Sequence, residues 1–239
     1  MSYEKVGEII IAPKFCGPPD SGNGGYACGL AAQSILGTAE VKLLRPLPLN
    51  TPLQLAKKNS TIELRDRNQI IAELRSTTLD LPVPSPPSFI EAQAASKNYL
   101  GFKDHKYPTC FVCGPDREPG EGLRLFPGKI SGKNLVATPW IPDANLGDAD
   151  GWVRPEFLWA ALDCPGVFAA MTDHFPFLLL GTLTASIENK IPVGEKAVVI
   201  GWPLGTEGRK INVGSAIFSE SGKLIAKAKG VWILPKSPP

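Results

Sequence analysis

Two short segments of the chain carry residues that could do chemistry: one opens a predicted helix, and the other lies within a second predicted helix, just before Cys164-Pro165-Gly166. Gly24-Gly25 opens a nearly uncharged run over residues 24–36, directly after Asn23. Amides at a helix start carry a partial positive charge, so the N–H of Gly25, with or without that of Gly24, could stabilise a developing oxyanion. Asp163 has mostly apolar neighbours and could be a nucleophile or a base that activates water. The residues alone do not separate these two roles.

The elements that would position these residues occur twice along the chain. Thr38-Ala39 with Pro46 recurs 146 residues later, and residues 62–75 match residues 216–229 without a gap at a spacing of 154. A helix candidate rich in small residues precedes each copy, at 24–36 and 155–172. A duplicated unit of about 100 residues predicts two like domains packed as a pseudo-dimer.

Each copy is predicted to consist of a strand, a buried helix and a run of antiparallel strands. In the first copy we expect a strand at 4–15, a loop at 17–25, a helix at 24–36 ended by Gly37, strands at 39–49, and a hairpin at 60–79 that turns at 66–68. In the second we expect a strand at 122–126, a hairpin turn at 129–134, a strand at 135–140, a loop at 141–154, a helix at 155–172, and strands at 182–191, 196–204, 210–219 and 223–234.

This order predicts an α+β fold with two tandem hotdog domains, in which each antiparallel sheet wraps around a central helix. The first domain is expected over 1–81 and the second over 107–239, with a proline-rich connector at 82–106. A single hotdog leaves a sheet edge unpaired, so joining two copies would protect that edge.

Several short motifs are spread over most of the chain. Thr109-Cys-Phe-Val-Cys-Gly-Pro115, followed by Gly122-Leu-Arg-Leu, resembles the opening of hotdog acyl-CoA thioesterases of the phenylacetyl-CoA type. The segment from Pro155 to Asp163 resembles their central helix, where a Gly-Gly pair precedes a carboxylate by seven residues, and Gly24-Gly25 resembles the same helix start. The resemblance implies cleavage of acyl-CoA thioesters, with amides of one subunit's helix facing a carboxylate of its partner.

The two helices differ where this resemblance places the chemistry. In register, Gly24-Gly25 aligns with Pro155-Glu156, and Ala32 aligns with Asp163. The first helix keeps the glycines and the second keeps the acid. The resemblance therefore implies one composite site from Gly24, Gly25 and Asp163, and a degenerate counterpart from Pro155-Glu156 and Ala32.

Each catalytic candidate also has a structural interpretation. Asp163 could cap a helix or pair near its end, and Gly24-Gly25 could be packing glycines where helix meets sheet. Asn23 fits a helix N-cap better than a catalytic amide. These alternatives stay open at the level of the sequence.

Four further residues are candidates for substrate binding. Asp20 could orient water or make an Asx turn, and the turn is favoured. Glu156 at a helix start is stabilised by the helix dipole and is also a reserve candidate for a second acid. Trp152 and Trp159 could line an acyl pocket or belong to the core, and Trp152, in a loop rich in glycine and aspartate, is the better pocket candidate.

The cysteines and histidines argue against other chemistries. Cys110-x-x-Cys113 has no second CxxC, so zinc would need to recruit His105 and Cys16. We therefore predict no metal and no cofactor, and interpret this cysteine pair as structural. The only other histidine is His174, and neither histidine lies in a nucleophile motif. A hotdog hydratase, which usually needs an Asp-His pair, is accordingly disfavoured.

The composition argues against nucleic acids and membranes as partners and leaves small molecules. The net charge of +2 gives no electrostatic case for nucleic acid, and no apolar run is long enough to span a membrane. The N-terminal residues lack a signal-peptide pattern, so we expect a cytoplasmic protein. An acyl-CoA is the expected substrate and homo-oligomerisation is plausible. The alternative to a thioesterase is a non-catalytic module that binds an acyl thioester or another small ligand.

Overall fold

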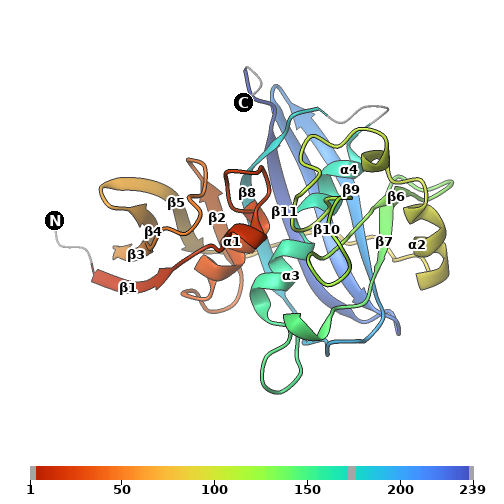
Figure 1. The fold of residues 1–239 in the computed structure, drawn as a ribbon, viewed down its shortest axis with the longest axis horizontal. Coiled ribbons are helices and arrows are strands. Elements are labelled where there is room, and N and C mark those ends of the chain that lie inside the picture. Colours follow the sequence, from red (N-terminus) through yellow and green to blue (C-terminus); the bar gives the residue numbers. More distant parts are fainter. Residues whose placement is uncertain (1–3, 172–175, 237–239) are drawn as a thin grey trace.

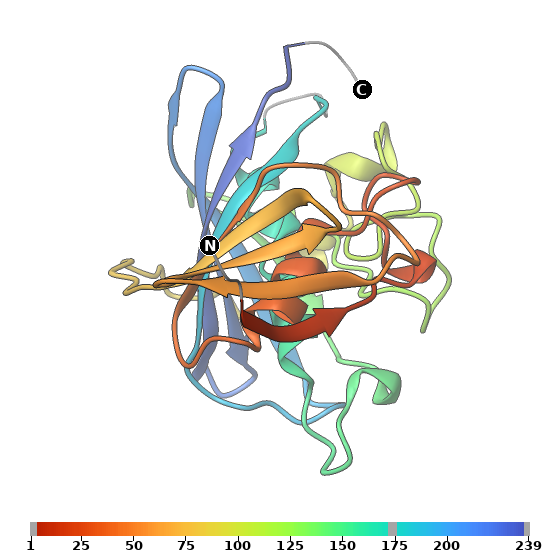
Figure 2. The same cartoon turned by 90° about the vertical axis from the view of Figure 1, so that its left-hand side faces the viewer.

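One continuous antiparallel sheet organises the molecule. The computed structural model describes residues 4–171 and 176–236. Eleven strands follow the order β1-β3-β4-β5-β2-β8-β11-β10-β9-β7-β6. The sheet curves around α1, α3 and α4, which lie on one side of it (Figures 1 and 2).

The first half contributes five strands and the short helix that the strands enclose. Its elements are β1 (Glu4–Ile9), a 3-10 helix (Pro13–Phe15), α1 (Gly24–Ala32), β2 (Ala39–Leu43), β3 (Leu53–Lys58), β4 (Thr61–Asp66) and β5 (Gln69–Ser76). The predicted hairpin is confirmed, and it turns at Arg67, which has a positive φ of 50°. The predicted strand at 4–15 is wrong beyond Ile9, because Pro13 begins the 3-10 helix. β3 was not predicted.

The second half is larger and contains two helices. Its elements are β6 (Gly128–Lys129), β7 (Val136–Trp140), a 3-10 helix (Ala144–Leu146), α3 (Pro155–Ala161), α4 (Cys164–Ala169), β8 (Leu179–Ile187), β9 (Ala197–Glu207), β10 (Lys210–Ser219) and β11 (Leu224–Ile233). The four predicted strands after the helices are present with shifted ends, and β10 has the predicted bounds. The predicted strand at 122–126 is wrong. Arg124 there has a φ of +51°, which a strand does not accommodate.

The two halves join along a seam between β2 and β8. Ala39 lies opposite Ala185, which is its own counterpart in the repeat. A residue that pairs with its counterpart marks a local two-fold axis, as at the isologous interface of a homodimer. On the concave side α1 packs against α3, close enough that a Cβ on Gly29 would lie 2.7 Å from the Cα of Glu156. The predicted pseudo-dimer is therefore present within one chain.

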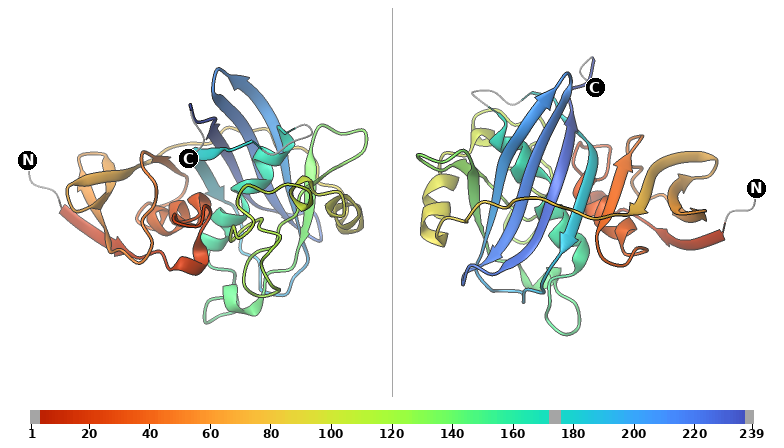
Figure 3. Two further views of the ribbon diagram at one scale, coloured as in Figure 1. Left: turned by 45° about the horizontal axis from the view of Figure 1, so that its top comes forward. Right: turned by 180° about the vertical axis from the view of Figure 1, so that it is seen from behind.

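The segment between the halves crosses the convex face of the second half's strands (Figure 3). It leads into α2 (Phe89–Ser96), which Ser88 and Glu91 begin with a capping box. A second core lies between this segment and the sheet, and its buried members include Leu81, Ala92 and Trp202. The connector therefore covers sheet surface that would otherwise be exposed.

Both predicted helices are shorter than expected. Asn23 caps α1 by accepting the Tyr26 N–H at 2.9 Å, and the helix ends at Ala32. Gly37 has the predicted positive φ, 78°, but lies in the turn before β2. The second helix breaks at Asp163, which has a ψ of −82°, and resumes as α4 with a proline in its first turn. A proline here cannot donate an N–H back into α3, which explains the break. Thr172, the predicted helix end, lies outside the described residues.

Candidate active site

The structure brings the predicted acid of the second half to the predicted helix start of the first. Asp163 Oδ2 accepts the Gly25 N–H at 2.9 Å and the Asn23 Nδ2–H at 3.0 Å. Asp163 is only 2% exposed, and its side chain makes no capping bond to α4. The structure therefore places Gly25 and Asp163 in direct contact across the two halves.

Gly25 must be a glycine for this contact to exist. A Cβ on Gly25 would lie 2.6 Å from the Cβ of Asp163 and 2.8 Å from the carbonyl oxygen of Trp159. Gly25 therefore serves both close packing of the two helices and donation of its N–H to Asp163. Since the Gly25 N–H already binds Asp163, the amide that remains for a ligand is that of Gly24. It occupies the first helical position, where no intrahelical acceptor exists.

Asn23 connects the helix start to the acid. Its Oδ1 caps α1 while its Nδ2 donates to Asp163, so the same side chain serves both halves. The side chain is 2% exposed. The N-cap interpretation is confirmed, and the second contact adds a positioning role toward Asp163.

Burial makes Asp163 a carboxyl group that titrates near neutrality. Desolvation raises its pKa from the usual value near 4 to about 7, against the lowering effect of the Gly25 and Asn23 hydrogen bonds. Negative charge on the nearby Cys110 also raises it. Within the described residues Asp163 Oδ1 is buried and has no hydrogen-bond partner. One oxygen is therefore anchored and the other is uncommitted.

Asp163 opens onto a cavity of about 440 Å³ between the two halves. Asn23 and Gly24 share its wall with Asp163. Most of the remaining lining is apolar, and includes Leu43, Leu47, Val167, Phe168, Leu180 and Trp232. A mostly apolar cavity with a few convergent polar groups is the usual form of a small-molecule site.

The other sequence candidates do not line this cavity. Asp20 is exposed in the loop before α1, and Trp159 is 3% exposed in the core. Trp152 is half-buried in the loop before α3, under the Nζ of Lys190 at 5.8 Å from the ring centroid. None of these side chains contributes to the cavity wall around Asp163.

Glu156 belongs to the counterpart position, as the register predicts. Its Oε2 accepts a hydrogen bond from Gln33 Nε2 at 3.1 Å, and Arg154 lies 3.5 Å from its Oε1. Gln33 follows Ala32, the residue that aligns with Asp163. Glu156 is buried and lines none of the described cavities. The counterpart has thus become a packed polar contact.

Several cavity residues were not anticipated from the sequence as parts of this site. His105, Cys110, Cys113 and Cys164 all line it, next to Asp163. Cys113 and Cys164 donate hydrogen bonds that hold the pKa of the Cys110 thiol well below its usual value. The CxxC spacing was visible in the sequence, but nothing placed Cys164 beside it. His174, the other histidine, lies outside the described residues.

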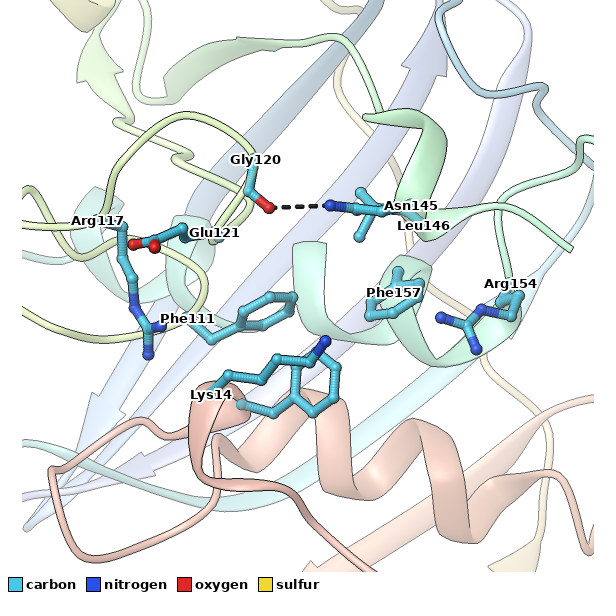
Figure 4. A pocket seen from close by; sticks show the side chains of 11 residues that line it. Lys14, Phe111, Arg117, Gly120, Glu121, Asn145, Leu146, Arg154 and Phe157 are labelled. Carbon is cyan, nitrogen blue, oxygen red and sulfur yellow. Dashed lines mark hydrogen bonds between the residues drawn. The ribbon is translucent and has the colours of Figure 1, made fainter.

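A second cavity, of about 330 Å³, lies on another part of the surface (Figure 4). Lys14, Arg117 and Arg154 surround it together with Phe111 and Phe157. No predicted catalytic residue lies in its wall. The site that combines an acid with a helix start is therefore the 440 Å³ cavity.

Solved structures resemble the chain over its whole length. The tesB protein of Mycobacterium avium subsp. paratuberculosis has a TM-score of 0.62 at 14% identity, with 98% of this chain and 96% of that chain covered. Acyl-CoA thioesterase II TesB2 of Mycobacterium marinum has a TM-score of 0.58 at 10% identity, with 98% and 97% covered. A hot dog fold protein of Alicyclobacillus acidocaldarius has a TM-score of 0.54 at 8% identity, with 99% and 96% covered.

The chain has a double-hotdog fold. The fold class expected from the sequence is thereby confirmed. No family model matches the sequence, and no curated protein does. Among the described residues of this double hotdog, no helix is long and apolar enough to cross a membrane.

Proposed function

We propose that this double hotdog hydrolyses an acyl-CoA thioester in the composite site of Asp163, Asn23 and the start of α1. One observation carries the proposal: the buried carboxylate of one half is bonded to the helix-start amide of the other half, in the wall of an apolar cavity. The thioesterase names among structures of similar fold are consistent with it.

Asp163 would supply the base. Its Oδ2 is held by two N–H donors, which leaves Oδ1 to take a proton from water. The hydroxide equivalent would attack the acyl carbon, and the proton held by Asp163 would pass to the departing CoA thiolate. With a pKa near 7, the group can both accept and return a proton at neutral pH. Direct attack by Asp163 on the acyl carbon is the other course that the geometry allows.

The Gly24 N–H would polarise the carbonyl oxygen. It lies at the first position of α1 in the cavity wall, where the helix dipole also favours negative charge. A donor of this kind is worth about 3 kcal/mol of transition-state stabilisation. The Gly25 N–H would instead hold Asp163 in place.

The cavity also indicates how the substrate would lie. Apolar walls around Phe168 and Leu180 suit the hydrocarbon part of the acyl group. Arg45 is exposed and lines the same cavity, so a cation is available to the phosphates of the CoA portion. These features favour CoA thioesters with an apolar acyl group.

A panel of acyl-CoA thioesters tests the proposal, with thiol release as the readout and a blank without substrate. We expect Asp163→Asn to lower kcat by about 10²–10⁴-fold while acyl-CoA binding persists, because the amide keeps an oxygen for the two donors but cannot act as a base. Asp150→Asn, which removes an exposed carboxylate, is the control.

Two results would overturn the proposal. Binding of acyl-CoA by the wild-type protein without thiol release across the panel would identify a binding module. Turnover that survives Asp163→Asn would place the chemistry elsewhere, and Glu156→Gln would then show whether the counterpart carries it.

A further inference from the structure

Three buried cysteines from two distant segments meet in one place. Cys110 and Cys113 come from the turn before residue 114, and Cys164 is the first residue of α4. Their sulfur atoms all lie within 4.8 Å of one another, and the side chains are 2–4% exposed. None of the three forms a disulfide. Buried free cysteines commonly serve as small apolar groups, but three converging sulfurs need a more specific explanation.

The backbone of the CxxC turn is built to direct its two sulfurs. The Gly114 N–H donates to the Cys110 carbonyl at 2.9 Å and closes the turn. A Cβ on Gly114 would lie 2.4 Å from the Pro108 carbonyl oxygen, so this tight turn requires glycine. The N–H of Leu125 donates to the Val112 carbonyl and fixes the middle of the turn. The turn holds the sulfur atoms of Cys110 and Cys113 within 4.8 Å of each other.

Polar N–H groups point at two of these sulfurs. Asn23 Nδ2 donates to Cys110 Sγ at 3.8 Å, and His105 Nε2 lies 3.4 Å from Cys113 Sγ. The Tyr107 N–H donates to His105 Nδ1 at 2.9 Å, so in the neutral ring the proton is on Nε2. His105 is therefore a donor to Cys113 rather than a base facing it. Hydrogen bonds donated to a thiolate favour its charged form, which is the form that binds a metal ion.

We propose that Cys110, Cys113 and Cys164 bind one Zn²⁺ ion as thiolates, with the fourth coordination position facing the cavity. Tetrahedral zinc with bonds of about 2.3 Å holds its sulfur ligands about 3.8 Å apart, which the 4.8 Å span of this cluster accommodates. All three cysteines line the 440 Å³ cavity, so one face of the ion would be open to it. Three protein ligands and one open position are the arrangement of zinc ions that bind exchangeable ligands.

This site differs from the one considered from the sequence. Cys16, which the CxxC pair would have had to recruit, instead contacts Arg117 and the carbonyl of Thr109. Cys164 takes its place, and His105 supports a ligand rather than being one. The inference is independent of thioester hydrolysis, because it stands on the sulfur cluster alone.

The metal content of the purified protein tests this inference. We expect wild-type protein to retain about one zinc ion per chain after dialysis against buffer, by elemental analysis. After removal of the zinc, addition of Co²⁺ should produce the visible bands of tetrahedral cobalt and a thiolate-to-cobalt charge-transfer band. Cys110→Ser, Cys113→Ser and Cys164→Ser should each weaken metal affinity at least 10-fold, whereas Cys16→Ser should retain it.

Measurements on the wild-type protein test the inference even if the cysteine variants do not fold. Absence of zinc together with a silent Co²⁺ titration of the wild-type protein would overturn the inference. So would a disulfide, seen as three titratable thiols instead of five in unfolded protein. If Cys16→Ser lost as much metal affinity as Cys164→Ser, the proposed set of ligands would be wrong. Metal content is measured independently of enzyme activity. Absence of zinc would therefore not contradict the proposed hydrolysis, which the thiol-release assay tests.

Discussion

Gly25→Ala tests the contact on which the composite site depends. The added Cβ would lie 2.6 Å from the Cβ of Asp163, 2.8 Å from the Trp159 carbonyl oxygen and 3.1 Å from the Cα of Ala160. Two of these three atoms are backbone of α3, so no side-chain rotation relieves the overlap. The two helices must separate by several tenths of an ångström or more.

The expected cost follows from overpacking. Added methyl groups in a packed core cost about 1–3 kcal/mol, and the better helix propensity of alanine returns at most about 1 kcal/mol. We expect Gly25→Ala to lose about 2 kcal/mol of unfolding free energy, or roughly 4–8 °C in Tm for a chain of this size. Because the separation also moves Asp163, thioester turnover should fall more than stability alone explains.

Gly24→Ala is the matched control, measured alongside by urea denaturation with tryptophan fluorescence. Its Cβ would lie 2.8 Å from Leu180 Cδ2, which can rotate away, and 3.2 Å from Leu180 Cβ, so it meets side-chain atoms and no backbone. We therefore expect a smaller loss of unfolding free energy. Equal stability of the two variants would refute the inference that α1 and α3 touch through Gly25.

Three further results are expected. In zinc-free protein, kcat/KM should rise with pH and level off above about 7. Asp163 must lose its proton to act as a base, and burial raises its pKa to about 7. A flat pH profile would contradict this role. Asn23→Asp keeps the N-cap oxygen but replaces a donor with a negative charge beside Asp163, so the midpoint of the same profile should move to higher pH, and an unchanged midpoint would contradict the contact. Ser215→Ala removes the 2.6 Å hydrogen bond to the Leu162 carbonyl at the break between α3 and α4, and should lower the unfolding free energy by about 1 kcal/mol in urea denaturation.

The internal repeat explains why much of the fold could be predicted. Equivalent positions in the two copies imply a two-fold arrangement, and Ala39 opposite Ala185 realises it directly. The same symmetry brought Gly25 and Asp163 together, since each residue has a counterpart of known register. Elements with strong local signals, such as the hairpin at Arg67, were predicted close to their observed bounds.

What was missed depends on packing between distant segments. Nothing near Cys164 in the chain indicates that it meets Cys110 and Cys113, because that contact arises from where the loop before β6 crosses α4. The Gly25 N–H was expected to face substrate, yet α1 and α3 approach so closely that Asp163 binds it directly. Trp152 was favoured for the pocket on its loop composition, which carries no information on the direction of a side chain.

The β2–β8 seam has a consequence for how this site can be lost. If the two halves were separate chains of a homodimer, dilution would dissociate them and separate Asp163 from Gly25. Every mutation would also occur in both subunits. A covalent pair holds its halves at an effective concentration in the millimolar range, so specific activity should not fall as the protein is diluted to nanomolar. A substitution in one half of a covalent pair is also not imposed on the other half, so Pro155-Glu156 and Ala32 can differ from Gly24-Gly25 and Asp163 at the equivalent positions.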